Sequence, residues 1–248
     1  MNARPTLAIV IPAYNEAAGI AASVHELRDY LSSRPWTWEI RVVDDGSTDA
    51  TASVVEAIER EDPRIRLQRE PHRGKGAAVR AGFLATTADY RFLCDADLSM
   101  PVRELERFMP PALGDADIAI GTREGAGARR VGEPLTRHLA GRAFNAVVRT
   151  LTVPGIQDTQ CGFKMFTAAA TEAIFPSLTV DGWAFDIEVL YVARLRGLRI
   201  REVPIEWHFR ADSRLRMFPD SLKMLREVFR IRLGASRGAY DAGRLPTR

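Results

Sequence analysis

The chain has 248 residues, 46% hydrophobic and 27% charged; these are ordinary globular proportions and exclude a disordered chain, a collagen and a small disulfide scaffold. Its longest clean apolar run, residues 7–11, is far shorter than the ~20 residues of a membrane-spanning helix, and Pro12 interrupts it, which argues against a signal peptide. Residues 191–248 carry 14 Lys and Arg against 6 Asp and Glu, whereas the preceding residues are net acidic, so the basic end is expected to meet an anionic partner.

The first half of the chain alternates short apolar runs with segments of helical spacing. Such runs are typical of buried parallel strands, and their alternation with helices predicts an α/β fold with a mostly parallel sheet and helices on both faces. The expected strands are residues 7–11, 39–43, 65–68, 90–94 and 117–121. The expected helices are residues 16–32, 50–60 and 74–85.

The second half of the chain is less regular. Residues 122–132 are rich in Gly and Arg and are expected to be mobile. We interpret residues 1–217 as one domain, followed by an amphipathic basic helix over 218–233 and a loose tail over 234–248. The other expected elements are helices over 134–151 and 184–196 and a strand near 199–208.

Four polar clusters stand at or just beyond the ends of the expected strands. Ligands of open α/β sheets bind outside the carboxyl ends of the strands, so four clusters there are poorly explained as simple turns. One cluster contains Gly74-Lys75-Gly76, but it is not a phosphate loop, because position 76 lacks a Ser or Thr. No strand is followed by the G-x-G-x-x-G of a dinucleotide site. The clusters are residues 12–16, 44–49, 73–76 and 95–97.

Asp95 and Asp97 follow the expected strand 90–94 with one residue between them. At a strand end, two such carboxylates can converge on one hard cation, and Mg²⁺ or Mn²⁺ is commonly held by carboxylates together with substrate phosphates. A capped turn before Pro101 is the alternative. The four histidines are scattered along the chain, which argues against a zinc site.

In residue type, order and spacing, these clusters resemble the motifs of inverting family 2 glycosyltransferases, which have the GT-A fold. The resemblance covers residues 6–233. It implies a metal-dependent enzyme in which Mg²⁺ or Mn²⁺ on Asp95 and Asp97 holds the diphosphate of a nucleotide-sugar and stabilises it as the leaving group. Asp44 suits a structural role within the implied set. The implied donor-binding residues are Pro12, Tyr14, Glu16, Asp44, Asp45, Lys75, Asp95, Ala96 and Asp97.

Two further motifs bear on the acceptor. Residues 159–164 and 185–188 are similar to segments of dolichyl-phosphate β-glucosyltransferases, and the Q-x-x-R-W motif of processive synthases is absent from the sequence. Gly182 stands where the eukaryotic glucosyl enzymes are expected to have Arg. The resemblance implies transfer of glucose from UDP-glucose to a polyprenyl phosphate. The alternatives are mannosyl transfer from GDP-mannose, transfer to a sugar hydroxyl, and a nucleotide-sugar-binding regulator without turnover.

The two kinds of acceptor need different residues. A phosphate monoester is already an anion at pH 7, since its second pKa is near ~6, whereas a sugar hydroxyl needs a general base. Candidate bases are Asp158 and Asp186, although structural or loop-positioning roles suit them better. The resemblance places Arg123, Arg137, Gln160 and Lys164 at the acceptor, with Arg130 and Arg142 as weaker candidates. Arg210 and Arg214 would close over the diphosphate.

The basic end carries an apolar and a basic stripe at helical spacing. Such a helix suits the plane of an anionic membrane, where each basic residue contributes about 1 kcal/mol; a helix packed on the body is the alternative. Nucleic acid is a poorer partner, because no recognised binding motif accompanies the charge. We expect a cytoplasmic protein, peripheral on a membrane directly or through a membrane-protein recruiter; Cys94 and Cys161 fit a reducing compartment. The apolar stripe is Phe218, Leu222, Leu225, Phe229 and Leu233, and the basic stripe is Lys223, Arg226, Arg230 and Arg237.

Overall fold

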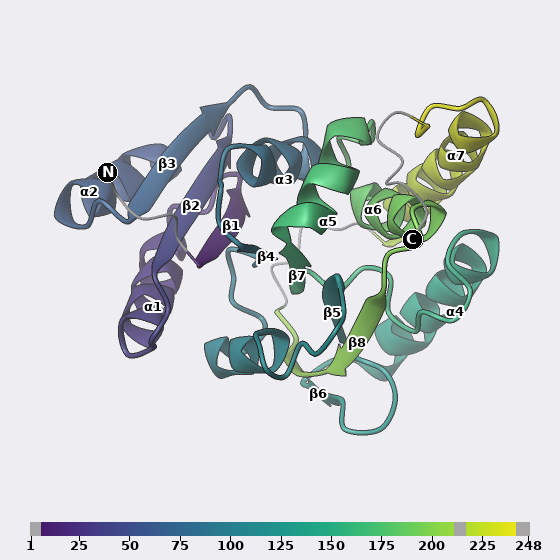
Figure 1. Ribbon diagram of the computed structural model, residues 1–248, viewed down its shortest axis with the longest axis horizontal. Helices are drawn as coiled ribbons and strands as arrows, with labels where there is room; N and C mark the ends of the chain where they lie inside the picture. Colours follow the sequence, from purple (N-terminus) through teal and green to yellow (C-terminus); the bar gives the residue numbers. More distant parts are fainter. Residues whose placement is uncertain (1–5, 211–216, 242–248) are drawn as a thin grey trace.

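The computed structural model describes residues 6–210 and 217–241. Its centre is a seven-stranded sheet in the order β3-β2-β1-β4-β7-β5-β8, with helices on both faces (Figure 1). Its strands are β1 (Leu7–Ala13), β2 (Trp38–Asp45), β3 (Ile65–Glu70), β4 (Tyr90–Leu93), β5 (Ile118–Thr122), β7 (Lys164–Thr167) and β8 (Ile200–Pro204). A second, two-stranded sheet pairs β6 (Arg129–Val131) with β9 (Glu206–His208).

The helices form two layers. Helices α1 (Ile20–Ser32), α2 (Thr51–Glu61) and the 3₁₀ helix η1 (Val102–Phe108) pack in the hydrophobic cluster on one face of the sheet. The cluster on the other face contains residues of α3 (Lys75–Leu84), α4 (Leu135–Leu151), α5 (Ala168–Ile174), η2 (Phe175–Ser177), α6 (Phe185–Leu195) and α7 (Met217–Ser236).

Strand β1 explains why both faces are covered. Leu7, Ile9 and Ile11 belong to one cluster, and Val10 belongs to the other, because successive side chains of a strand point to opposite faces. Strand β1 pairs in parallel with β2 on one side and with β4 on the other. The predicted α/β class and the expected alternation of strands and helices in the first half are therefore confirmed.

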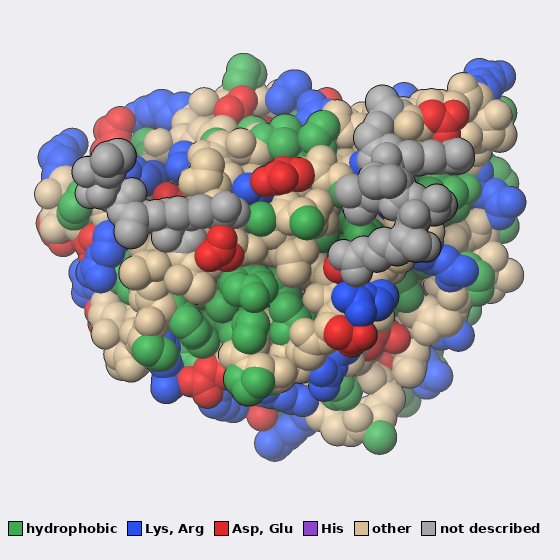
Figure 2. Space-filling view, in the orientation of Figure 1, with side chains coloured by type: hydrophobic (Ala, Val, Ile, Leu, Met, Phe, Trp, Pro, Cys, Tyr) green, Lys and Arg blue, Asp and Glu red, His purple; other side chains and the backbone are tan. Residues whose placement is uncertain are grey.

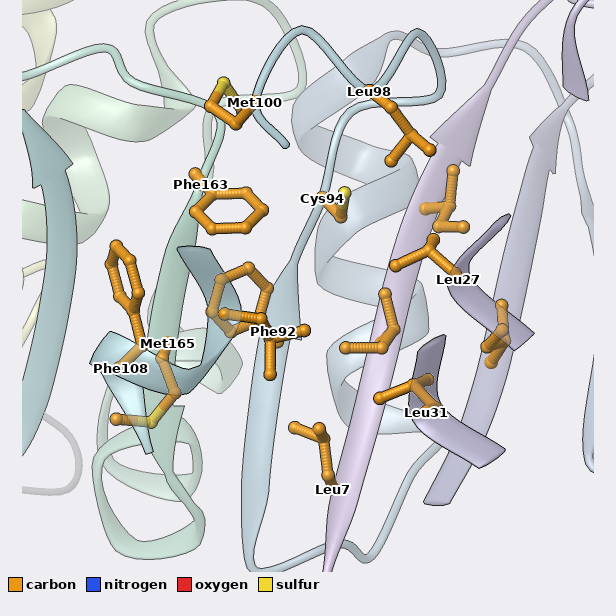
Figure 3. Packing of buried hydrophobic residues seen from close by; sticks show 14 of the residues in the cluster. Leu7, Leu27, Leu31, Phe92, Cys94, Leu98, Met100, Phe108, Phe163 and Met165 are labelled. Carbon is orange, nitrogen blue, oxygen red and sulfur yellow. The ribbon is translucent and has the colours of Figure 1, made fainter. Parts of the chain in front are cut away.

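Strand β7 departs from the parallel pattern. It runs antiparallel between β4 and β5, a pairing that the apolar runs do not indicate. Just before β7, the ring of Phe163 meets Phe92 edge-on, with ring centroids 4.4 Å apart, and it meets Phe108 in the same way at 5.2 Å (Figure 3). This aromatic contact presses the segment before β7 against the carboxyl end of β4.

Two expected irregular segments have more structure than their composition suggests. Residues 122–132, expected to be mobile, include β6, whose pairing with β9 is parallel. The described part of the expected tail, residues 234–241, completes α7 and places Tyr240 in the core, 5% exposed. In both cases distant partners supply the order, so local composition does not indicate it.

Helix α7 turns a different face to the body from the one that its sequence stripe suggests. Met224, Val228 and Ile231 are buried, whereas Leu222 and Phe229 of the predicted apolar stripe are 66% and 60% exposed. The alternative in which this stripe packs on the body is therefore wrong for these two residues. The side chains of Phe218 and Arg214 lie outside the described residues. Within the described residues, no helix combines the length and apolarity needed to cross a bilayer.

Candidate functional site

Three of the polar clusters meet because their strands are neighbours. Strand β1 lies between β2 and β4, and Ala13 pairs with Asp44 in the parallel register. Asp95 lies two residues beyond the end of β4. This is a switch point, where successive strands are added on opposite sides of β1 and a crevice opens at the carboxyl edge.

The loops after β1 and β2 are tied together by side-chain hydrogen bonds. Asn15, at φ 51°, accepts the backbone N–H of Thr48 at 2.7 Å through its side-chain oxygen. Its own N–H donates to Ser47 Oγ at 2.8 Å. Glu16 N–H donates to Thr51 Oγ1 at 2.7 Å. The predicted donor-binding loop therefore has a defined conformation, with Pro12, Tyr14 and Glu16 on it.

Asp45 holds the loop that leads into α3. Its carboxylate accepts the N–H of Arg73 and of Gly74, each at 2.9 Å, and lies 2.9 Å from His72 Nδ1. The His72 ring stacks on Tyr14 with centroids 4.1 Å apart, which makes a flat aromatic surface beside this carboxylate. Asp44 accepts the N–H of Ser47 within its own turn.

The amino end of α3 is pressed against the loop before α6. A Cβ at Gly76 would lie 2.5 Å from the carbonyl oxygen of Val180, so this approach requires glycine. Between Gly74 and Gly76, Lys75 extends its ammonium to within 2.5 Å of Asp95 Oδ1 and 5.4 Å from the centre of the Trp183 ring. Burial opposes the charge on this lysine, but the nearby Asp95 raises the Lys75 pKa.

Asp95 and Asp97 lie in the same cleft but have different partners. Asp97 accepts the N–H and the hydroxyl of Ser99, at 3.0 and 2.7 Å. Asp95 faces Gly162, where a Cβ would lie 1.9 Å from its Oδ2. Within the described residues, no cluster of three or more His, Cys, Asp or Glu forms a complete metal site. Two carboxylates fit a hard cation that takes its other ligands from phosphate and water.

The cleft has a volume of about 400 Å³ and joins this carboxylate pair to a cationic wall. The wall comes from the loop after β5 and from α4. Arg137 lies with its guanidinium carbon 4.9 Å from the centre of the Phe209 ring. Predicted site residues that line the cleft are Lys75, Asp95, Asp97, Arg123, Arg130, Arg137, Arg142, Asp158, Gln160, Asp186 and Arg210.

Arg123 and Asp158 form a two-pronged ion pair at the base of this wall. Nε and Nη2 of the arginine donate to the two carboxylate oxygens at 2.7 and 2.9 Å. Burial raises the pKa of Asp158, but the charge of Arg123 outweighs it and lowers that pKa to about 2. Glu202 accepts the N–H of Asp158 at 3.1 Å and so helps to position the segment that carries Asp158. Asp158 is thus an ionised partner of Arg123.

Lys164 and Asp186 pair inside the body. Lys164 is 1% exposed, and its ammonium lies 2.5 Å from Asp186 Oδ1. Lys164 is not among the residues that line the cleft, so it does not reach the predicted acceptor position. Burial raises the pKa of Asp186, against the effect of Lys164.

The remaining cations are partly neutralised by neighbouring acids. Arg130 donates to Glu124 at 2.8 Å and to Glu133 at 2.7 Å, and Arg142 lies 3.7 Å from Glu124. Arg210 is exposed at the cleft. Arg214 lies outside the described residues, so its predicted role stays a prediction.

Sequence reasoning missed several contributors, His72 beside Asp45 among them. Trp207 lies beside the guanidinium groups of Arg123 and Arg130, 5.3 and 5.7 Å from its ring centre. Ser99 holds Asp97, and its position two residues after an aspartate is a local signal that could have identified it. Glu202 gave no such signal, because it is 44 residues from Asp158 in the chain.

The sheet order, the crevice at the switch point and the carboxylate pair define a GT-A fold. A model described as Glycosyl transferase family 2 matches residues 8–175, and the chain belongs to this family. Over 220 residues it is 37% identical to a dolichyl-phosphate β-glucosyltransferase of Trichomonas vaginalis, with 84% of this chain and 65% of that protein covered. The chain thus spans less than two thirds of that relative. The enzyme of the same name from Dictyostelium discoideum is 33% identical over 244 residues, covering 91% and 73%.

A solved structure confirms the fold. Glucosyl-3-phosphoglycerate synthase from Mycobacterium tuberculosis, in complex with Mn²⁺ and UDP-glucose, matches with a TM-score of 0.65 at 23% identity. The match covers 93% of this chain and 78% of that one. The predicted GT-A fold and family resemblance are therefore confirmed, and the roles of the individual site residues stay predictions.

The Gly162→Ala change tests whether Asp95 needs the space beside it. The added methyl would displace the carboxylate; on the prediction that Asp95 and Asp97 hold a metal-bound donor, we expect Mn²⁺-dependent binding of UDP-glucose to weaken at least tenfold in calorimetry while the folded chain persists. Gly19→Ala is the control, because among the described residues no atom beyond its chain neighbours lies within 4 Å of that added Cβ. Equal donor binding in the two variants would contradict the role of the glycine.

The Asp158→Asn change tests the buried ion pair. It leaves Arg123 without its counter-charge, so we expect the free energy of unfolding at pH 7 to fall by about 3 kcal/mol. The native pKa of about 2 lies below the ordinary value of ~3.9, so the stabilisation is present above about pH 4 and is lost as the pH falls towards 2. Denaturant titrations should show the difference shrinking over that range. A difference independent of pH would refute this account; the exposed Asp115→Asn is the control.

Proposed function

We propose that this chain transfers glucose from UDP-glucose to a polyprenyl, dolichyl-type phosphate with inversion, using Mg²⁺ or Mn²⁺. The observation that carries the proposal is the cleft itself, in which Asp95 and Asp97 stand opposite the arginines of α4 and the loop after β5. One end suits a metal-bound diphosphate, and the other suits a second phosphate. The dolichyl-phosphate β-glucosyltransferases among the relatives support this choice of acceptor and sugar.

The donor would lie across the edges of β1 and β4. The stacked pair of Tyr14 and His72 offers a flat surface for a base, with the Asp45 carboxylate beside it. The diphosphate would then reach Asp95 and Asp97, with Lys75 at its edge. The metal would be held by these two aspartates and would neutralise the charge that develops on the leaving diphosphate.

The acceptor end is built to hold an anion. Arg123 is fixed in direction by Asp158 and Trp207, and Arg137 lies on the facing helix. A phosphate acceptor needs positioning rather than deprotonation at neutral pH. Asp158 forms an ion pair with Arg123, and Asp186 is hydrogen-bonded to Lys164. These contacts argue against either carboxylate as the general base for a sugar hydroxyl.

A membrane surface would supply such an acceptor. On α7, Leu222, Phe229 and Leu233 point outward beside basic residues, and α4 exposes Leu135 and Leu139. Figure 2 shows Lys and Arg side chains among hydrophobic ones along the right-hand edge, over α4 and α7. The two helices are in contact, and residues of both line the cleft. We propose that this edge lies on anionic lipid at the cytoplasmic face of a membrane.

The direct test is an incubation of the chain with polyprenyl phosphate, Mn²⁺ and a panel of nucleotide-sugars. We expect a lipid-linked glucose from UDP-glucose and none after chelation of the metal. If only GDP-mannose gave a lipid-linked product, the transferred sugar would be mannose and not glucose. Donor binding without any lipid-linked sugar would favour the non-catalytic regulator, and product on a free sugar would favour a hydroxyl acceptor.

The Arg137→Ala change separates the two ends of the cleft. It removes a cation from the acceptor wall, so we expect the KM for polyprenyl phosphate to rise at least tenfold, since hydrogen bonds to a charged group contribute about 1.5–3 kcal/mol. Donor affinity, measured by calorimetry, should be unchanged. Equal loss of donor and acceptor affinity would contradict the assignment.

The membrane proposal predicts a loss of vesicle binding when Leu222, Phe229 and Leu233 are changed to Ser together. Each buried leucine contributes about 1.5–3 kcal/mol, so we expect at least a tenfold weaker association with vesicles of phosphatidylcholine and phosphatidylserine. Leu84→Ser is the control, because this side chain is 49% exposed and lies on α3, outside α4 and α7. If the triple variant sedimented with vesicles as well as the unchanged chain does, the membrane proposal would be wrong.

A further inference from the structure

A buried carboxylate on α6 joins the end of the chain to the donor side of the cleft. Glu188 is 0% exposed. Its oxygens accept the N–H of Thr179 at 3.0 Å, the N–H of Val180 at 2.9 Å and the hydroxyl of Tyr240 at 2.7 Å. The Thr179 hydroxyl also donates to it at 2.7 Å. Among the described residues, no Lys or Arg forms an ion pair with Glu188, so hydrogen-bond donors alone compensate its burial.

Among the described donors to Glu188, Tyr240 is the one most distant in the sequence. Burial and the neighbouring Glu188 raise the pKa of Tyr240. Its hydroxyl therefore stays protonated and donates a hydrogen bond to Glu188. Tyr240 follows α7, and a cavity of about 270 Å³ lies beside it, between α7 and residues 179–180. The Tyr240 hydrogen bond therefore lies beside this cavity, where α7 meets residues 179–180.

The loop that Glu188 holds is the one that shapes the amino end of α3. The carbonyl of Val180 abuts Gly76, and the carbonyl of Asp181 accepts the N–H of Ala77 at 3.2 Å. Trp183, at the end of this loop, lies beside the Lys75 ammonium. Figure 1 shows α6 between α3 and α7, the arrangement that this relay requires.

We propose that Glu188 and Tyr240 are positioning residues that couple the seating of α7 to the donor end of the cleft. Tyr240 fixes Glu188, Glu188 fixes the backbone at Thr179 and Val180, and that backbone sets the places of Lys75 and Trp183. Neither Glu188 nor Tyr240 lines the cleft. The effect on donor binding rests on the proposed function, whereas the effect on the loop does not.

The test is Tyr240→Phe, which removes one hydroxyl and keeps the ring. Loss of one buried hydrogen bond should speed hydrogen exchange at the amides of Thr179 and Val180 by about fivefold in the ligand-free chain. The Kd for UDP-glucose with Mn²⁺ should rise by a similar factor, and the KM for polyprenyl phosphate should stay unchanged. Tyr30→Phe, on α1, is the matched control, because it also loses a hydroxyl hydrogen bond but packs on the other face of the sheet, and it should alter none of these.

Glu188→Gln tests the other member of the pair. Glu188→Gln places an amide group where two backbone N–H groups need an acceptor, so we expect faster exchange over 178–184 and a larger loss of donor affinity than in Tyr240→Phe. Unchanged exchange at residues 179–180 in Tyr240→Phe would overturn the coupling. Faster exchange with unchanged UDP-glucose affinity would overturn its link to the donor. Hydrogen exchange can be measured even if the chain has no transferase activity. Failure of the proposed function is therefore distinguishable from failure of the coupling.

Discussion

The carboxylate of Asp95 stands in a space that exists because residue 162 has no side chain. Glycine alone does not create that space; Phe163 must be held in the aromatic cluster with Phe92 and Phe108, which brings the segment before β7 against the end of β4. From the other side, Gly76 lets α3 approach the loop before α6 and brings Lys75 to Asp95. Close backbone approach on two sides thus defines where an anionic ligand and its cation could lie.

Charge in the cleft is arranged by pairing rather than by accumulation. Arg123 is held by Asp158, and Arg130 is held by Glu124 and Glu133, so these cations have defined partners and the wall is only partly neutralised. A buried charge without a partner is costly, and this explains why the arginines of this wall come with their own acids. An incoming phosphate would compete with these carboxylates for the arginines. Because the carboxylates already have a defined geometry, this competition favours a ligand of fixed shape and charge.

Much of the fold and part of the site follow from local patterns. The runs at β1, β2 and β4 predict buried strands, and the polar residues after them meet because parallel strands end at one edge. Strand β7 was not recognisable, because its four residues carry no sign of antiparallel pairing. Lys164 illustrates the same limit: a lysine in a promising motif is buried against Asp186, and only the tertiary contact between these two side chains, one on β7 and one on α6, decides this.

The sequence by itself determined the α/β class, the family and the group of strand-end residues that face the crevice, since these depend on short-range spacing. The tertiary structure decided which charges meet, which face of α7 is buried and how Tyr240 reaches Glu188, 52 residues away. Periodicity identified an apolar stripe on α7, yet Leu222 and Phe229 remain outside while Met224 and Val228 pack inward. The physical reason is that a helix with apolar residues on more than one side is oriented by the shape of the surface that receives it.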